Sequence, residues 1–281
     1  MKTVGEILKL TQDCFKEKGI GRARRTAEEL VRYVLHLSRM ELYLHYEKPL
    51  IEKEIEQLRL LVKRKLKGEP LEYLVQTLSF YQCTLLVTQG VLIPRPETEI
   101  LLDKICSRLK TLSLENKCAW DLCTGSGCLG IGLKKTFPQL SVTLSDLSSK
   151  ALAIARHNAQ ANGVDVLCLE GDLLEPFRGQ TADFILCNPP YVSSKDYEHL
   201  DPSVRLFEPR EALWAGEEGL FFYKRLSAEL GPYVKPGTLL FLEIGKDQGK
   251  AVYNLFFEQG WKILSLEKDW AGHDRFFFLE R

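Results

Sequence analysis

Apolar residues recur at helical spacing through the first 75 residues of the chain. The pattern is clearest in three stretches, Val4–Leu8, Ala27–Leu35 and Ile51–Val62. Apolar positions three to four residues apart are typical of a helix that buries one face. Glycine and proline punctuate the intervals between the stretches. Residues 1–75 are therefore predicted to form a small helical-bundle domain.

The pattern changes over residues 76–96, where short apolar runs replace the helical spacing. The runs Phe80–Val87 and Val91–Ile93 flank the turn-forming residues Thr88-Gln89-Gly90. Two such runs around a glycine-containing turn predict a β-hairpin, which would link two domains. The segment Pro94-Arg95-Pro96-Glu97-Thr98-Glu99 then opens an amphipathic helix that is expected to run to about Leu109.

From residue 118 onwards, predicted strands and helices alternate. Such alternation favours a mostly parallel sheet covered by helices on both faces, so 97–281 is predicted to be one α/β domain. Residues 193–216 are expected to form one long irregular connection, and such connections are often functional. The expected strands are 118–122, 141–146, 164–170, 182–187, 238–244, 261–267 and 275–280. The expected helices are 129–136, 148–162, 217–230 and 247–259.

Charge is balanced over the whole chain but not along it. The formal net charge is zero, whereas residues 1–70 carry 16 Lys+Arg against 11 Asp+Glu, a net of +5, which leaves −5 for the remainder. The excess is compatible with an acidic partner for the N-terminal domain. It is far smaller than the basic patch of a dedicated nucleic-acid binder, so no direct nucleic-acid partner is expected.

Composition predicts a protein of the reducing cytoplasm. No apolar run approaches the roughly 18 residues that a membrane span needs, and the first residues lack the apolar core of a signal peptide. The eight cysteines include no Cys-x-x-Cys pair, which indicates free thiols and no metal site. The chain is expected to be a monomer without membrane contact.

The segment Asn188-Pro189-Pro190-Tyr191 follows the predicted strand 182–187 and suggests a site. Two prolines in succession end the strand's hydrogen-bond ladder and leave neighbouring carbonyls free to accept. The segment thus offers an amide, carbonyls and an aromatic ring at the carboxyl end of a strand, where open α/β sheets bind ligands. It suits a small planar group with an NH2. The alternative is an ordinary turn.

A glycine loop and two acids indicate a nucleoside cofactor. The loop Asp121–Gly127 ends strand 118–122, and Asp146 ends the next strand, where an acid can bind the hydroxyls of a ribose. Asp172, after the third strand, could lie near an adenine amino group. Asp146 as a helix N-cap and Asp172 as a turn residue are the alternatives. Because a complete dinucleotide fingerprint is missing, a nucleoside without phosphates fits better than a dinucleotide. The electrophile that matches the Asn188–Tyr191 segment is the methyl group of S-adenosyl-L-methionine, which is therefore the expected cofactor.

In combination, these motifs resemble the HemK/PrmC family, the protein-glutamine methyltransferases of peptide chain release factors. The resemblance rests on the Asn188–Tyr191 and Asp121–Gly127 segments and covers nearly the whole chain. It also rests on four further segments: Gly68-Glu69-Pro70-Leu71, Leu92-Ile93-Pro94-Arg95-Pro96-Glu97-Thr98-Glu99, Phe207-Glu208-Pro209-Arg210-Glu211-Ala212-Leu213, and Glu243-Ile244-Gly245 with Gln248-Gly249. It implies a class I Rossmann-like methyltransferase domain at 97–281, a hairpin linker at 76–96 and a substrate-recognition domain at 1–75.

The resemblance also implies the roles of individual residues. Asn188 and the Pro189 carbonyl would accept the N–H bonds of a glutamine amide in the Gly-Gly-Gln motif of a release factor, and Tyr191 would pack against the amide plane. The expected catalytic residues are Asn188, Pro189 and Tyr191, and Pro190 joins them in binding substrate. The expected cofactor-binding residues are Cys123, Thr124, Gly125, Ser126, Gly127, Asp146, Asp172, Leu173 and Asn188.

One residue departs from the family pattern, and rival functions stay open. Cys123 stands where the family usually has glycine, which could alter cofactor affinity. The Asn188-Pro189-Pro190-Tyr191 segment, a rigid elbow, would also serve a nucleic-acid methyltransferase that acts on an exocyclic amine, or a methyltransferase of a ribosomal-protein glutamine. A non-catalytic cofactor-binding or translation-factor-binding protein is a third possibility, which the intact Asn188 disfavours.

Overall fold

The computed structural model describes residues 2–281 and divides into two compact units. One unit runs to Gln76 and includes Pro202–Phe207 from later in the chain. The other comprises Thr77–Asp201 and Glu208–Arg281. Among the described residues, no helix combines the length and the apolar character that crossing a membrane requires.

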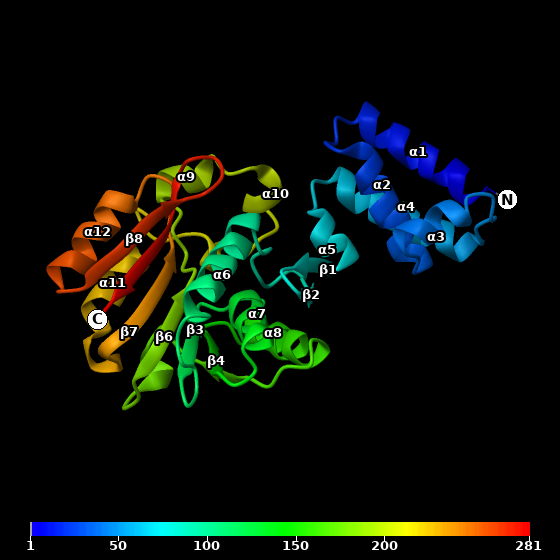
Figure 1. Ribbon diagram of the computed structural model, residues 1–281. Helices are drawn as coiled ribbons and strands as arrows, with labels where there is room; N and C mark the ends of the chain where they lie inside the picture. The colour runs from blue at the N-terminus through cyan, green and yellow to red at the C-terminus, as the bar shows by residue number, and fades with distance from the viewer. Residues whose placement is uncertain (1) are drawn as a thin grey trace. The chain divides into compact units, whose positions relative to one another are not determined.

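The first unit is a bundle of helices (Figure 1). A capping box begins α1, because the Thr3 hydroxyl accepts from the Glu6 N–H while the Glu6 carboxylate accepts from the Thr3 N–H. The apolar faces of the helices meet in a separate core that includes Phe15, Leu30 and Leu42. The helices of the bundle are α1 (Val4–Glu17), α2 (Ala23–Leu35), α3 (Arg39–Leu44), α4 (Glu52–Leu66) and α5 (Leu71–Val75). The short α10 (Pro202–Arg205) belongs to the same unit, but none of its residues is among the described residues that form this core.

A hairpin forms within residues 76–96, but the predicted pairing is wrong, because Val91–Ile93 is not a strand and the turn falls inside Phe80–Val87. Strand β1 (Thr77–Phe80) pairs with β2 (Cys83–Leu86), so the turn lies at Tyr81-Gln82 and not at Thr88-Gln89-Gly90. Tyr81 takes the left-handed conformation with φ of 52°, and its N–H donates to the Glu99 carboxylate at 2.6 Å. This distant partner fixes the turn, which explains why local turn residues gave the wrong position.

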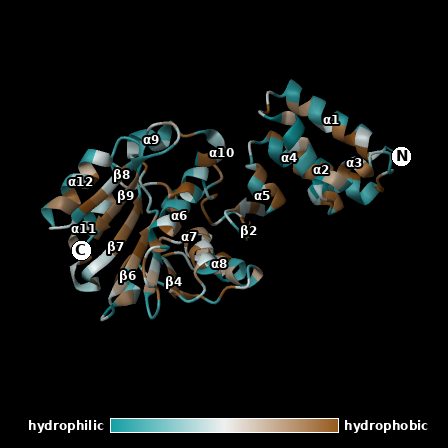
Figure 2. Cartoon of the chain, in the orientation of Figure 1, coloured by the Kyte–Doolittle hydropathy of each residue, from teal (hydrophilic) through white to brown (hydrophobic). Residues whose placement is uncertain are grey.

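The predicted α/β architecture is confirmed by a seven-stranded sheet in the order β5-β4-β3-β6-β7-β9-β8. The first five strands in this order are parallel, and β9 is antiparallel to both of its neighbours. Figure 2 shows brown, apolar segments along β6 and β7. The strands are β3 (Cys118–Leu122), β4 (Ser141–Asp146), β5 (Leu167–Glu170), β6 (Ala182–Cys187), β7 (Val234–Glu243), β8 (Lys262–Lys268) and β9 (Asp274–Glu280).

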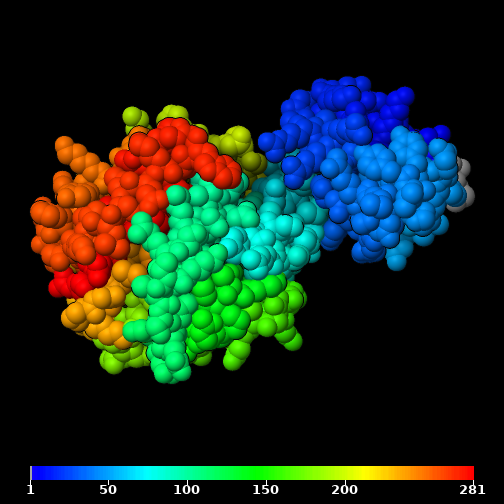
Figure 3. All heavy atoms as spheres, in the orientation of Figure 1, coloured from blue at the N-terminus to red at the C-terminus, as the bar shows by residue number. Residues whose placement is uncertain are grey.

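Helices cover both faces of the sheet. Helix α7 contacts α6 and α8, whereas α11 contacts α12. Figure 3 shows α6 beside the red C-terminal segment, where Lys104 and Arg108 form salt bridges to Glu267 of β8. The helices are α6 (Pro96–Leu109), α7 (Cys128–Thr136), α8 (Ser149–Ala161), α11 (Phe221–Glu229) and α12 (Gly249–Glu258). Helix α11 and strand β5 are both shorter than expected.

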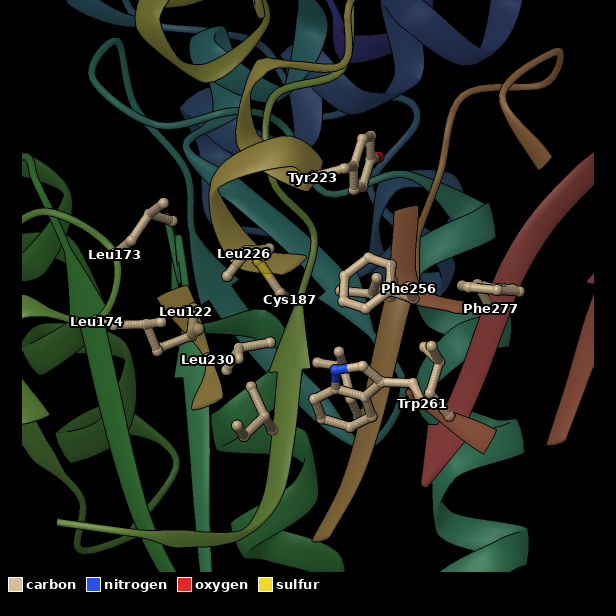
Figure 4. Packing of buried hydrophobic residues seen from close by; sticks show 14 of the residues in the cluster. Leu122, Leu173, Leu174, Cys187, Tyr223, Leu226, Leu230, Phe256, Trp261 and Phe277 are labelled. Atoms are coloured by element: carbon tan, nitrogen blue, oxygen red, sulfur yellow. The ribbon is translucent and has the colours of Figure 1, made fainter. Parts of the chain in front are cut away.

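The core under α11 and α12 reaches the end of β6. Cys187, the last residue of β6, is fully buried in this apolar cluster with Leu122, Tyr223 and Leu226 (Figure 4). Close packing on all sides holds such a position rigidly. Asn188, the next residue, therefore leaves the sheet from a fixed point.

The connection after β6 is more regular than predicted. It contains α9 (Ser194–Glu198), α10 and a 3₁₀ turn at Arg210–Ala212. Val192 anchors it by donating to the Leu213 carbonyl and accepting from the Ala215 N–H, both at 2.9 Å. The helices in this segment have at most five residues, which is too short for apolar periodicity to reveal them.

Candidate active site

A pocket of about 500 Å³ lies in the second unit at the carboxyl ends of β3, β4 and β6. This is the edge at which open parallel sheets bind ligands, and the volume falls within the usual range for small-molecule sites. Cys123 and Gly125 line the pocket from the loop after β3, Asp146 lines it from β4, and Asn188 and Pro190 line it from the segment after β6.

A buried carboxylate holds the loop after β3 in shape. Asp121 accepts from the Thr124 hydroxyl at 2.6 Å and from the Gly130 N–H at 2.9 Å. Burial raises the pKa of Asp121 to about 7, against these two hydrogen bonds, which lower it. Gly127 has φ of 83°, and an added Cβ there would lie 2.6 Å from Ile131. The positive φ therefore favours glycine at Gly127, and a larger residue would also require the end of the Ile131 side chain to shift.

Cys123 occupies a backbone conformation that favours glycine. Its φ is 55°, in the left-handed region, which gives a physical reason for the glycine usual in the resembled family. Cys123 is half-buried and lines the pocket, so its side chain narrows the space there. Gly125 lies beside it, with no atom within 4 Å of an added Cβ.

Asp146 is fixed by two backbone N–H groups. Its carboxylate accepts from Gly125 at 2.8 Å and from Ser148 at 2.9 Å. The N-cap of α8 is Ser148, whose hydroxyl accepts from the Ala151 N–H, so the alternative in which Asp146 caps this helix is wrong. Burial raises the pKa of Asp146 even though backbone hydrogen bonds favour its charged form. The carboxylate lies at the pocket with lone pairs to spare.

Asp172 and Leu173 also line the pocket, after β5. Both carboxylate oxygens of Asp172 accept from Arg225 Nη1, at 2.9 and 2.8 Å. Leu173 is 4% exposed and has φ of 47°. Arg225 thus orients the Asp172 carboxylate and reduces its freedom to turn toward a ligand.

The Asn188–Tyr191 elbow divides its side chains between the pocket and the protein. Both prolines are buried, but only Asn188 and Pro190 line the pocket, whereas Pro189 and Tyr191 do not. The Tyr191 hydroxyl donates to Glu243 at 3.3 Å, and its backbone carbonyl accepts from Gln248 Nε2 at 2.9 Å. The ring of Tyr191 is therefore held through its hydroxyl, and its backbone is held through its carbonyl.

Not all of the predicted cofactor residues line the main pocket. Thr124 and Ser126 line a separate cavity of about 40 Å³ that Asn188 also borders. Gly127 lies at the start of α7 and lines neither cavity. Within the described residues, the buried hydroxyls of Ser126 and Ser145 have no hydrogen-bond partner, and Ser145 lines the main pocket.

Several residues at the site were not recognised from the sequence. The pocket is also lined by Val91, Leu92, Ala212 and Phe222, and Thr98 and Glu243 lie behind Asn188. Thr98, Leu92, Ala212 and Glu243 lie within the motifs that carried the family resemblance. Their presence there was a usable signal, but it did not tell which side chains meet.

The motif Leu92–Glu99 and the segment 207–213 are joined by a buried carboxylate. Glu208 accepts from the Arg95 guanidinium at 2.6 Å and from the Ile93 N–H at 3.0 Å. Its side chain is 1% exposed. This ion pair brings two segments more than 110 residues apart to the same wall of the site.

The described residues contain no cluster of three or more His, Cys, Asp or Glu with the geometry to hold a metal ion. The charged residues that line the main pocket are Asp146, Lys150, Asp172 and Glu211, and the buried carboxylates of Asp121 and Glu243 lie close to it.

Two family models match the chain. The PrmC N-terminal domain matches residues 6–75, and the methyltransferase small domain matches residues 97–209. Curated relatives match over nearly the full length, and each is named release factor glutamine methyltransferase. The relative from Thermodesulfovibrio yellowstonii is 38% identical and covers 92% of each chain. That from Bacillus subtilis is 35% identical and covers 98% of this chain and 96% of its own.

Solved structures of methyltransferases share the fold. A methyltransferase from Pyrococcus furiosus superposes with a TM-score of 0.54 at 16% identity, covering 80% of this chain and 98% of its own. A 16S rRNA methyltransferase from T. thermophilus gives 0.52 at 18% identity and covers 73% of this chain and 49% of its own. At such low identity, the likeness concerns the fold alone.

Proposed function

Because the chain belongs to the release factor glutamine methyltransferase family, we propose that it methylates peptide chain release factors. The methyl group passes from S-adenosyl-L-methionine to the side-chain amide nitrogen, N5, of the glutamine in the Gly-Gly-Gln motif, which gives N5-methylglutamine, S-adenosylhomocysteine and one released proton. The observation that carries the proposal is the Asn188-Pro189-Pro190-Tyr191 elbow, which follows β6 and borders the pocket.

The residues around the pocket fit S-adenosyl-L-methionine. The Asp146 carboxylate is held by backbone N–H groups and keeps lone pairs for the two hydroxyls of a ribose. The unpartnered Ser145 hydroxyl and the open space beside Gly125 add a polar contact and room for close approach. Apolar Leu173 and Phe222 suit the faces of a planar base. When bound, the cofactor supplies an electrophilic methyl group on a sulfonium.

The elbow supplies what an amide nitrogen needs in order to react. The lone pair of the glutamine amide nitrogen is delocalised into the amide carbonyl, which makes the nitrogen a poor nucleophile. Positioning and preorganised dipoles must therefore lower the barrier to methyl transfer. In this proposal, Asn188 Oδ1 and the Pro189 carbonyl accept the two N–H bonds of the substrate amide and draw electron density toward nitrogen. Tyr191 packs against the amide plane and excludes water. The proton leaves after attack, so no general base is required.

The proposal assigns substrate selection and catalysis to different parts of the chain. The amide of one glutamine is a small target, so a second contact must select the substrate. We assign this role to residues 1–75, which form most of the first unit, with 76–96 as a linker and 97–281 as the catalytic domain. The net charge of +5 over residues 1–70 suits an acidic partner.

The remaining features of the proposal concern the state of the protein. It acts in the cytoplasm as a monomer and binds no nucleic acid directly. Eight free cysteines suit a reducing compartment, and the neutral net charge gives no general attraction to nucleic acid.

The test is a transfer assay with labelled S-adenosyl-L-methionine and the full-length protein. An intact release factor should take up one methyl group, and mass spectrometry should locate it on the glutamine of Gly-Gly-Gln. The matched control is the same factor with alanine in place of that glutamine, which should take up none. Label in RNA, DNA or a ribosomal protein, with none in the release factor, would overturn the proposal.

A further inference from the structure

A chain of hydrogen bonds runs from Asn188 into the protein. Asn188 Nδ2 donates to Thr98 Oγ1 at 3.2 Å, and Thr98 Oγ1 donates to Glu243 Oε2 at 2.7 Å. The other carboxylate oxygen, Glu243 Oε1, accepts from the Tyr191 hydroxyl at 3.3 Å. Thr98 is 2% exposed and Glu243 is 1% exposed, so water does not compete for these bonds.

The direction of each bond in this chain follows from the one before it. An ionised carboxylate has lone pairs and no proton, so Glu243 can only accept. The single hydroxyl proton of Thr98 must then point at Glu243, which leaves the Thr98 oxygen only lone pairs for its other neighbour. Asn188 must therefore turn its NH2 toward Thr98. Its carbonyl oxygen, on the opposite branch of the amide, is turned away from Thr98.

We infer that Thr98 and Glu243 are positioning residues, which set the orientation of the Asn188 carboxamide. This inference rests on the proposed function, in which the Asn188 oxygen must accept an N–H of the substrate amide. An Asn188 turned the other way would present its own NH2 to the substrate NH2, and two donors cannot bond. Asn188 alone is symmetrical in shape, so some neighbour has to select the productive orientation.

The relay, meaning the hydrogen bonds from Asn188 through Thr98 to Glu243, explains why two separate motifs accompany the Asn188–Tyr191 elbow. Thr98 lies in the first turn of α6, within Pro94–Glu99, and Glu243 ends β7. The Thr98 and Glu243 bond spans 145 positions of sequence, and the Asn188 and Thr98 bond spans 90. The helix start and two strand ends thus converge behind one amide.

The charge of Glu243 is set by its surroundings. Burial raises the pKa of its carboxyl to about 7. Hydrogen bonds from Thr98 and Tyr191 and the Arg275 guanidinium on β9 lower it, and the Glu97 carboxylate raises it. From α11, the Tyr223 hydroxyl faces Glu243 and donates to its backbone carbonyl at 2.9 Å.

Protonation of Glu243 would reverse the chain of bonds. A protonated carboxyl can donate to Thr98, which frees the Thr98 proton for the Asn188 oxygen and favours the unproductive orientation. The catalytic rate constant of the wild type should therefore fall as one proton is taken up below about pH 7. Glu243→Gln cannot take up this proton, so the fall in kcat that Glu243 causes should be absent from its pH profile, and only the contribution of Asp121, whose pKa is also about 7, should remain.

Substitutions at Thr98 test the geometry without changing charge. Thr98→Val has nearly the same shape but no hydroxyl, and its kcat should fall about 10- to 100-fold, less than for a group that touches the reacting atoms. Thr98→Ser keeps the hydroxyl and should restore most of the rate. The Kd for S-adenosyl-L-methionine should change less than threefold in both variants.

Asp183→Asn is the matched control for Glu243→Gln, because it also neutralises a buried carboxylate. Asp183 lies near the start of β6, at the opposite end of that strand from Asn188. It should keep the wild-type pH profile. Methylation of the release factor by the wild type is measured first, and its absence would reject the proposed function. If the wild type is active, three outcomes reject the roles of Thr98 and Glu243. The first is a wild-type kcat that does not change with pH, and the second is the same dependence of kcat on pH in Glu243→Gln as in the wild type. The third is a Thr98→Val variant that keeps a third or more of the wild-type kcat.

Discussion

The two ends of strand β6 hold polar groups in opposite ways. Near its start, Asp183 accepts from Lys117 at 2.9 Å and forms a salt bridge to Lys235 at 2.8 Å. Near its end, three carboxylates at or behind the pocket are those of Asp121, Asp146 and Glu243. Within the described residues, these three form no salt bridge and accept from hydroxyls and backbone N–H groups.

The pKa values follow this difference. Burial alone would raise the pKa of Asp183, but hydrogen bonds from Lys235 and Lys117 lower it to about 2. Burial without a bonded cation raises the pKa of both Asp121 and Glu243 to about 7. The amino end of the sheet is thus compensated, and it stabilises the fold. At the carboxyl end, Asp172 and Glu208 are also paired, with Arg225 and Arg95. Asp121 and Glu243, however, are buried without a bonded cation, which opposes folding and is typical of functional sites.

The largest expected effect on kcat is at Asn188, which directly follows β6 and lies five residues after Asp183 in the sequence. Asn188→Ala removes the proposed acceptor of the substrate amide, so kcat should fall about 10²- to 10³-fold, as for other groups preorganised toward a reacting centre. Calorimetry should find nearly unchanged affinity for S-adenosyl-L-methionine. Asp183→Asn, the control, should keep its kcat. A turnover above about a tenth of wild type in Asn188→Ala would remove Asn188 from the mechanism.

A smaller effect is expected at Asp146, on the neighbouring strand. Asp146→Ala removes the proposed partner of the ribose hydroxyls and should weaken S-adenosyl-L-methionine binding by roughly 1.5–3 kcal/mol, on the scale of hydrogen bonds to charged groups. Titration calorimetry measures it directly. Asp146→Asn keeps one acceptor oxygen, and its affinity should lie between those of wild type and alanine variant. Unchanged affinity in a folded Asp146→Ala would leave the carboxylate only its structural bonds to Gly125 and Ser148.

At the carboxyl end of the sheet, the sequence predicted the strands, the loops and the motifs better than the contacts between their side chains. Alternating strands and helices, the Asp121–Gly127 loop and Asp146 are local patterns, so spacing and residue type were enough to place them at one sheet edge. The Asn188 elbow was found in the same way, because consecutive prolines must interrupt a strand.

What the sequence did not predict depends on contacts between distant segments. Nothing local indicates that Glu99 fixes the turn at Tyr81, or that Lys117 and Lys235 meet at Asp183. Likewise, Thr98 and Glu243 belong to recognised motifs, but only the fold brings them together behind Asn188. Hydrogen-bond partners 18 to 145 residues apart are outside the reach of periodicity.

The smallest effect concerns how stability changes with pH, and the two ends should differ in sign. Asp183 has an ordinary pKa of 3.8 and a folded pKa of about 2, so its contribution is present above pH 3.8 and is lost as the pH falls toward 2. Glu243 has an ordinary pKa of 4.5 and a folded pKa of about 7. The folded protein therefore holds its proton longer, and the contribution of Glu243 declines as the pH rises from 4.5 to 7.

Two variants isolate these opposite slopes. The stability advantage of wild type over Asp183→Asn should shrink as the pH is lowered from 4 to 2, whereas Glu243→Gln should gain on wild type as the pH is raised from 5 to 7. Each slope should be about 1 kcal/mol per pH unit, since one proton sets a limit near 1.4. All four tryptophans (Trp120, Trp214, Trp261 and Trp270) lie in the second unit, so their fluorescence during urea unfolding reports on the sheet. If both variants converged on wild type over the same pH range, the carboxylates at the two ends would be held alike, and charge compensation would not distinguish the stabilising end of β6 from the reactive one.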